Sequence, residues 1–344
     1  MSSRTQHAVT TMKAITQYRY GGLDTLEYET VARPVAEKDE VLIRVQGASI
    51  NAADWLIMQG EPFLVRLAFG LRRPKVSTRG RDVAGVVEAV GDDVRGFSVG
   101  DEVYAEVDAG SFAEYTVARQ KRLAHKPSRL SFGEAAAVPL AATTALQGLR
   151  DVAKIKPGDT VLINGASGGV GSFAVQLAKA FGAEVTGVCS TANLEFVRSL
   201  GADHVIDYTS ENFAMGEARY DVIFDLVSNR SLAECRRALT RRGTLVLASG
   251  NGGSVLGPLR RMLAAMLLGM FVPQSLRPLT AVANGADLEV LRELIEAGTI
   301  TPAVDRSYPL AETAEAIRYF AEEHPRGKVT ITVTSQNNTK EQHS

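Results

Sequence analysis

The residues with the clearest chemical role form a glycine-rich turn in INGASGGVGSFAVQLAKAFGAEV (163–185). Gly165, Gly168 and Gly171 follow the spacing GxxGxxG, a relative of GxGxxG. Glycines let backbone N–H groups approach a pyrophosphate, and a helix that starts there favours its negative charge. A tight structural turn would also use glycine, but the strand before and the helix after favour dinucleotide binding. We expect the cofactor to lie against Gly165, Ala166, Ser167, Gly168, Gly169 and Val170.

The residues after the following strand indicate which dinucleotide is bound. Sites that prefer NAD place an acidic residue about 20 residues beyond the glycines, on the ribose 2′-hydroxyl. Here the strand ends with Ser190, Thr191 and Asn193, and the nearest acid, Glu195, lies in the next helix. Small polar side chains leave room for a 2′-phosphate, so NADPH is expected rather than NADH. The nearest cation, Arg198, is a turn or two into that helix, and the hydroxyls would also serve as helix caps.

Strands and helices must position the glycine turn and the residues after the next strand. From about Ser131 onward, the sequence has a pattern of alternating strands and helices. DTVLING, AEVTGVCS, DHVIDY, YDVIFDLV and GTLVLAS are strand-like, with helical segments between them. Such alternation implies right-handed βαβ units and a doubly wound parallel sheet of the Rossmann type. Ser131 and Glu134 form a capping box, which predicts a helix over residues 131–151.

The chain before Ser131 has a different pattern. From Met12 to about Val117 short strands alternate with Gly and Asp turns, which predicts a mostly antiparallel β domain. The fold class is therefore α/β. Residues 1–11 and the polar residues after Val333 are expected to be loose tails.

Composition excludes several function classes. The 344 residues are 45% apolar and 22% charged, as in ordinary globular proteins, and the formal charge of −1 argues against nucleic-acid binding. The two cysteines, Cys189 and Cys235, form no CxxC pair, which indicates a reducing compartment, and we expect a cytoplasmic protein. No apolar run reaches 18 residues and no signal-peptide core is present, so we expect no transmembrane segment.

Seven motifs in order resemble the medium-chain dehydrogenase/reductase superfamily, and most of all its zinc-free, zeta-crystallin-like quinone oxidoreductase branch. They are ASINAADW (48–55), GRDVAGVVEAVGDDVRGFSVGDEVYA (80–105), GSFAEYTVA, VPLAATTALQGL (138–149), VLINGASGGVGSFAVQLAKAFGAEV, SLGADHVIDY (199–208) and GKVTI. The resemblance implies a GroES-like β-barrel catalytic domain, with an active site in the cleft between it and an inserted Rossmann domain. The implied boundaries are 1–138, with 299–344 returning to the barrel, and 139–298 for the Rossmann domain.

The resemblance also bears on metal and substrate. Zinc-dependent members hold catalytic zinc with a cysteine and a His-Glu pair; this chain has Asn51 and Arg81-Asp82 there. No zinc is therefore expected. Without a Lewis acid the substrate must be easy to reduce, which favours a quinone or an α,β-unsaturated carbonyl. The rival functions are a catalytically weak NADPH sensor, an alcohol dehydrogenase of the same superfamily, and an RNA binder, which the net charge disfavours.

Two residues are candidates for direct contact with the reacting groups. Asn51 would donate to the oxyanion that develops on the substrate, or its amide would satisfy loop backbone. Thr143 is placed by the resemblance against the nicotinamide, or its hydroxyl bonds its own helix. Asp54 is expected to be structural, through an Asx-type bond or a salt link to Arg81.

Further residues are expected around the rest of the cofactor. Tyr208 and Ser190 would lie on the adenosine-phosphate side. Arg326 and Lys328, in HPRGKV, would return to the cofactor from the C-terminal segment, or would be solvated.

The segment 257–279 is strongly apolar and rich in methionine, with flanking arginines. It is too short to span a bilayer. It would be a helix buried against the cleft or a dimer partner, a methionine-lined lid, or a peripheral membrane contact. The family tends to dimerise, so we expect a homodimer.

Overall fold

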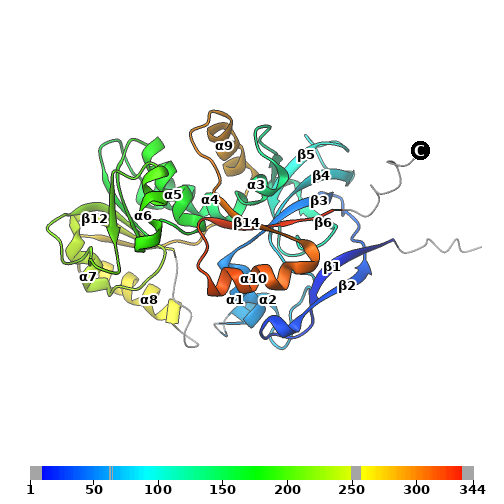
Figure 1. The fold of residues 1–344 in the computed structure, drawn as a ribbon, viewed down its shortest axis with the longest axis horizontal. Helices are drawn as coiled ribbons and strands as arrows, with labels where there is room; N and C mark the ends of the chain where they lie inside the picture. Colours follow the sequence, from blue (N-terminus) through cyan, green and yellow to red (C-terminus); the bar gives the residue numbers. More distant parts are fainter. Residues whose placement is uncertain (1–9, 62, 64, 249–256, 335–344) are drawn as a thin grey trace, which may run out of the picture.

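The computed structural model describes residues 10–61, 63, 65–248 and 257–334. These residues build two large β-sheets at opposite ends of the molecule and a separate two-stranded sheet (Figure 1). The predicted tails lie almost wholly outside the described residues. The described chain starts a strand at once, β1 (Thr11–Gln17), which pairs with β2 (Leu26–Ala32) in an antiparallel hairpin.

The first sheet combines strands from both ends of the chain. Its order is β14-β15-β3-β4-β5-β7, with β6 also paired to β3. Every pair except β14–β15 is antiparallel. Its strands are β3 (Glu40–Ile50), β4 (Asp82–Val90), β5 (Glu102–Glu106), β6 (Tyr115–Arg119), β7 (Leu123–His125), β14 (Val304–Pro309) and β15 (Lys328–Thr332).

The alternation of apolar residues along β3 explains how this sheet packs. Val41, Ile43 and Val45 are fully buried on one face. Because β15 pairs with β3 so that Val329 faces Ile50, the C-terminal segment enters the sheet beside the end of β3. Short helices α1 (Ala52–Gln59), α2 (Val65–Phe69) and α10 (Thr313–Glu322) complete this half.

The second sheet is parallel throughout and has the order β10-β9-β8-β11-β12-β13. This is the doubly wound order expected of a Rossmann domain, and it confirms the predicted α/β fold class. The strands are β8 (Thr160–Asn164), β9 (Glu184–Cys189), β10 (His204–Asp207), β11 (Tyr220–Asp225), β12 (Leu239–Leu247) and β13 (Ser275–Pro278). The helices between them are α5 (Gly169–Ala180), α6 (Leu194–Ser199), α7 (Leu232–Ala238) and α8 (Gly257–Gly269).

The boundaries 138/139 and 298/299 remain a prediction. Every strand of the seven-stranded sheet lies outside residues 139–298, and every strand of the parallel sheet lies within them, as the prediction requires.

The predicted helix over residues 131–151 is divided in the structure. Ser131 and Glu134 form the predicted capping box at the start of α3 (Phe132–Ala136). A second helix, α4 (Pro139–Gln147), starts at Pro139 and runs into a π-helical turn, Gly148–Ala153. Proline has no N–H to donate and is well suited to a first helical position, so the chain breaks one helix and starts another there.

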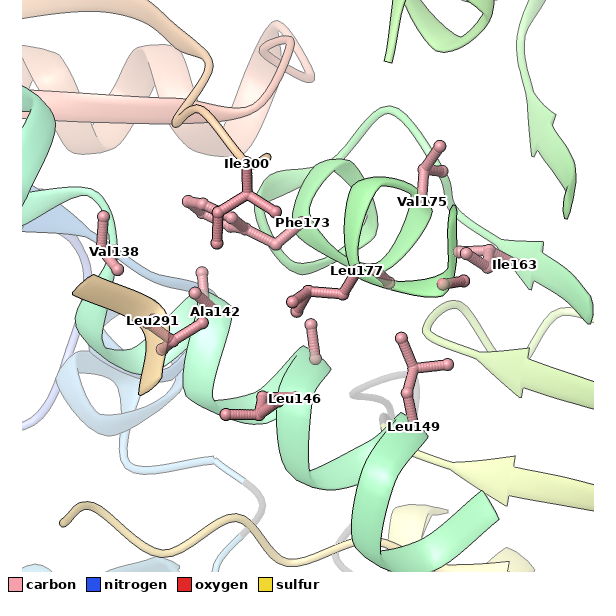
Figure 2. Packing of buried hydrophobic residues seen from close by; sticks show 14 of the residues in the cluster. Val138, Ala142, Leu146, Leu149, Ile163, Phe173, Val175, Leu177, Leu291 and Ile300 are labelled. Carbon is pink, nitrogen blue, oxygen red and sulfur yellow. The ribbon is translucent and has the colours of Figure 1, made fainter. Parts of the chain in front are cut away.

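The core of the Rossmann half lies where α5 packs on α4 (Figure 2). Phe173 and Leu177 of α5 are fully buried, as is Leu146 of α4, and Ile300 lies beside Phe173. The two halves are also joined through α9 (Gly285–Glu296), because the buried hydroxyl of Tyr104 in β5 donates to the carbonyl oxygen of Leu288 at 2.6 Å.

The apolar segment 257–279 forms α8, the following turn and β13. Arg261 anchors α8 by an ion pair with the buried Asp225, at 2.8 Å. Large apolar side chains nevertheless remain exposed along it, from 50% for Leu263 to 82% for Phe271. In this chain the segment is therefore not buried against the cleft, and cover by a second copy stays a prediction. Among the described residues no helix has the length and apolar character needed to cross a membrane.

Substituting Phe173→Ala should lower the free energy of unfolding by about 3–5 kcal/mol, because it opens a cavity in a fully buried site. Phe271→Ala is the matched control: its ring is 82% exposed, and the change should stay within about 0.5 kcal/mol. Denaturant unfolding followed by far-ultraviolet circular dichroism measures both. Equal losses in the two variants would contradict this description of the core.

Candidate active site

The glycine turn joins the end of β8 to the start of α5. Gly165 has φ +91°, a conformation that other residues rarely adopt, and Gly168 is the N-cap of α5 without a side-chain cap. A Cβ on Gly171 would lie 2.0 Å from the carbonyl oxygen of Gly165, so helix and turn can approach only because this residue is glycine. The amino end of a twelve-residue helix is thus presented through bare backbone, which suits a pyrophosphate.

The C-terminal segment crosses this turn. The N–H of Gly327 donates to the carbonyl oxygen of Ser167 at 2.8 Å, and an isolated parallel bridge pairs Gly327 with Gly168. Next along the chain, the alkyl stem of Lys328 passes over Gly169: a Cβ there would lie 2.9 Å from the lysine Cδ. A segment from the barrel half is therefore hydrogen-bonded to the glycine turn of the other half.

Four of the predicted cofactor residues come together beyond the end of β9. The Nδ2 of Asn193 lies 3.3 Å from the hydroxyls of both Ser167 and Ser190. Arg326 donates from Nε to Asn193 Oδ1 at 2.8 Å, and from a terminal nitrogen to the carbonyl oxygen of Ala192 at 2.7 Å. The sequence places no cation beside Ser190, and the fold brings one there from more than a hundred residues away.

Tyr208 stands at the edge of the same region. It follows β10, its backbone N–H donates to the carbonyl oxygen of Cys189 at 3.0 Å, and its side chain is 47% exposed. The structure therefore places it next to the end of β9 and open to solvent.

Lys328 points away from the turn, into the barrel half. Its side chain is 3% exposed, and its ammonium donates to Asn51 Oδ1 and, at 2.9 Å, to the carbonyl oxygen of Ile50. Asp82 Oδ2 lies 3.6 Å from the same ammonium. Burial lowers the pKa of Lys328, while Asp82 and Asp54 act to raise it. Of the two C-terminal cations, Arg326 reaches the predicted cofactor region and Lys328 reaches Asn51.

Asp82 is the residue that the sequence analysis did not select. It is fully buried, and its carboxylate accepts from Asn51 Nδ2 at 2.9 Å and Ser49 Oγ at 3.1 Å. Its other oxygen accepts the N–H of Leu140 at 3.1 Å, at the start of α4. Asp82 thus connects Asn51, at the end of β3, with the start of α4. Its place beside Arg81 in GRDVAG was a signal, but one used only for the question of metal.

Asn51 is held at both ends of its amide. Its oxygen faces the Lys328 ammonium and its nitrogen faces the Asp82 carboxylate, so the neighbouring charges determine which end is which. Asn51 also begins α1 and forms a capping box with Asp54, whose carboxylate accepts the Asn51 N–H at 2.9 Å. Asp54 is therefore held by a capping-box bond rather than by the expected Asx-type bond, and the expected link to Arg81 is absent because Arg81 pairs with Glu106.

Thr143 lies in α4 and is 2% exposed. The alternative interpretation, a hydroxyl that bonds its own helix, describes the neighbouring Thr144 instead, which donates to the carbonyl oxygen of Leu140 at 2.7 Å. Among the described residues, no group of three histidine, cysteine or acidic side chains could hold a metal ion.

Comparison with known families matches both halves of the chain. The model described as "Alcohol dehydrogenase GroES-like domain" matches residues 37–128, and the one described as "Zinc-binding dehydrogenase" matches residues 200–331.

Comparison with individual proteins extends over almost the whole chain. It is 36% identical to a 2-methylene-furan-3-one reductase of Solanum lycopersicum and 37% identical to an NADPH-dependent alkenal/one oxidoreductase of Arabidopsis thaliana. Each match covers 93% of this chain and 79% of the relative. The solved structure of the quinone oxidoreductase from Coxiella burnetii superposes with a TM-score of 0.83 at 29% identity, covering 94% of this chain and all of that one.

These relatives also correct one prediction. The Arabidopsis oxidoreductase and several further relatives are chloroplastic or mitochondrial by name, so the predicted cytoplasmic location is wrong by this comparison. A low number of cysteines argues against an oxidising compartment, but it does not distinguish one reducing compartment from another.

The matches extend over almost the whole chain, and they agree with a barrel built from both chain ends and a glycine turn in the domain between them. The chain belongs to the medium-chain dehydrogenase/reductase superfamily, in its zeta-crystallin-like quinone oxidoreductase branch.

Proposed function

We propose that this protein is an NADPH-dependent oxidoreductase that reduces quinones or α,β-unsaturated carbonyls without zinc. The proposal is carried by the predicted cofactor region. There the start of α5 has no side-chain cap, and Ser190, Asn193 and Arg326 form a polar cluster next to the glycine turn. The names of the relatives, which are alkenal/one, furanone and quinone reductases, support the same chemistry.

The residues present suit NADPH. No acidic side chain ends β9, so the ribose 2′-position meets Ser190 and Asn193 instead of a carboxylate. Arg326 adds a guanidinium, the group best matched to a phosphate. When bound, NADPH supplies a hydride from nicotinamide C4.

Asn51 is the proposed donor to the substrate's carbonyl oxygen. Its Nδ2 carries two hydrogens and gives only one to Asp82, so the second is available for an oxyanion. The Lys328 ammonium and Asp82 hold the amide in one orientation, which pre-organises the donor before the substrate arrives. Thr143, from the α4 end that Asp82 also binds, is proposed to lie against the nicotinamide. Reduction at the β-carbon then leaves an enolate, to which solvent returns a proton.

The absence of zinc is proposed from the residues themselves. Asn51 stands where zinc-dependent relatives use a cysteine, and an ammonium bonded to it would repel a divalent cation. Arg81, in the histidine position, adds a second positive charge next to Asp82. The homodimer also stays a proposal, supported by the apolar side chains that α8 leaves exposed.

Purified protein should oxidise NADPH in the presence of a benzoquinone or of a short enone, and a chelator should leave the rate unchanged. The loss of reduced-nicotinamide absorbance measures both. Saturable NADPH binding without turnover would favour the sensor alternative, and chelator-sensitive turnover would contradict the zinc-free mechanism.

Replacing Arg326 by Gln should weaken NADPH binding by about 10- to 100-fold, the usual loss for one charged hydrogen bond, and should change NADH binding little. The matched control is Arg198→Gln, because Arg198 pairs with Glu195 on an exposed helix face. Quenching of protein fluorescence on titration gives the dissociation constants. A similar loss for both cofactors would mean that Arg326 supports the fold rather than the 2′-phosphate.

Asp54→Asn should remove a pH dependence of stability. Burial and the nearby Asp82 raise the pKa of Asp54 to about 6, so the folded chain holds this proton more tightly than the unfolded chain does. The resulting stabilisation is present at low pH and is lost as pH rises from about 4 through 6, a change of about 3 kcal/mol. Relative to the variant, the wild-type unfolding midpoint should therefore fall over that range. A difference between the two proteins that stays constant with pH would show that Asp54 ionises normally.

A further inference from the structure

A buried arginine lies close to the candidate active site and has no partner among the residues that the structure describes. Arg79, in the loop that leads to β4, is 8% exposed. Its guanidinium makes no hydrogen bond or ion pair with any residue in the part of the chain that the structure describes. The other deeply placed cations differ: Arg81 pairs with Glu106, and Arg261 pairs with Asp225.

An unpaired buried charge is costly, because the protein interior replaces water around it without returning hydrogen bonds. Burial lowers the pKa of Arg79, which is the expected sign of this cost. Asp54 and Tyr20 are the groups whose charges act to raise it, but neither forms an ion pair or hydrogen bond with it. A chain that keeps such a group gains nothing in stability from it, so another use must be sought.

Arg79 lines a cavity of about 210 Å³. Part of the wall is apolar and consists of Ile57, Phe69, Pro74 and Val76. This volume suits a small molecule, and the apolar wall suits a short hydrocarbon body rather than a free inorganic ion.

The other charged groups of the cavity already have partners. Arg81 pairs with Glu106 and Asp108 pairs with Arg122. Lys75 donates to the carbonyl oxygen of Ala68 at 3.0 Å. Asp54 accepts the backbone N–H of Asn51. Arg79 is thus the one charged side chain on this wall that forms no hydrogen bond or ion pair with any of the described residues.

The cavity adjoins the site of the proposed reaction. Asp54 lies one helical turn after Asn51, and Arg81 directly precedes Asp82, which binds the Asn51 amide. A molecule in this cavity therefore contacts residues that are bonded to Asn51 or lie next to its partner Asp82.

We propose that this cavity is a carboxylate-binding subsite, in which Arg79 holds the carboxylate of a short apolar acid. The guanidinium presents a planar pair of N–H donors that matches a carboxylate, and the apolar wall covers the hydrocarbon. Resting on the proposed function, the inference extends it: the preferred substrates are enones or quinones that carry a carboxylate away from the reducible bond.

Direct binding tests the subsite without turnover. Hexanoate should bind the wild-type protein saturably in calorimetry, hexanamide should bind about 10-fold or more weakly, and Arg79→Met should lose about 10- to 100-fold in hexanoate affinity. Arg72→Met, at an exposed neighbouring arginine, is the matched control and should bind as the wild type does. No hexanoate binding, equal binding of hexanamide, or tighter binding of inorganic phosphate would each overturn the proposal.

The stability of the same variant separates a binding role from a structural one. Since the Arg79 side chain has no partner among the described residues, Arg79→Met should unfold at the wild-type midpoint or above it. A midpoint lowered by more than about 2 °C would show that Arg79 supports the fold and would overturn the assignment.

Turnover then tests the substrate class. A short enone ending in a carboxylate should have a kcat/KM about 10-fold above that of its methyl ester, and Arg79→Met should abolish the difference. Equal values for acid and ester in the wild type would overturn the subsite while leaving the proposed reductase intact. Reduction of neither compound, with hexanoate binding still present, would instead contradict the proposed function and leave the subsite standing.

Discussion

The arrangement of both halves depends on one buried ammonium. Lys328 follows Gly327, which is hydrogen-bonded to the glycine turn, and its Nζ is bonded to Asn51 at the end of β3. Taking an ammonium out of water is unfavourable unless it is fully bonded, so the Asn51, Ile50 and Asp82 acceptors must stay in place around it. Moving the Lys328 ammonium away from these acceptors would cost free energy. This cost holds the C-terminal segment in contact with both halves of the molecule.

Three consecutive residues of the C-terminal segment contact three different parts of the molecule. Arg326 binds the loop after β9, Gly327 binds the glycine turn through its backbone, and Lys328 binds the barrel. Gly327 has φ +72°, and a Cβ there would lie 2.3 Å from the carbonyl oxygen of Ala303. Only glycine fits this position between the two halves. Backbone geometry therefore constrains Gly327, and charge constrains Arg326 and Lys328 on either side of it.

The sequence was sufficient for features that depend on local patterns. The glycine turn, the βα alternation and the Ser131 cap all follow from spacing within about 20 residues, and the structure contains each of them. The meeting of Arg326 with Asn193, and of Lys328 with Asn51, depends on the pairing of β15 with β3, which no local pattern specifies. For the same reason Lys328 was expected at the cofactor, whereas its ammonium lies in the barrel.

Lys328 and Arg79 are both buried cations, but they have opposite effects on the stability of the fold. Both are more than nine-tenths buried, yet Lys328 is surrounded by acceptors and Arg79 has none among the described residues. A satisfied buried charge specifies an arrangement of the chain, because every alternative leaves it unpaired. An unsatisfied one specifies no arrangement of the chain, and its burial lowers the stability of the fold. At such a residue, function departs from the optimum for stability. Here the residue lines a cavity with Asp54, which is hydrogen-bonded to the backbone of Asn51.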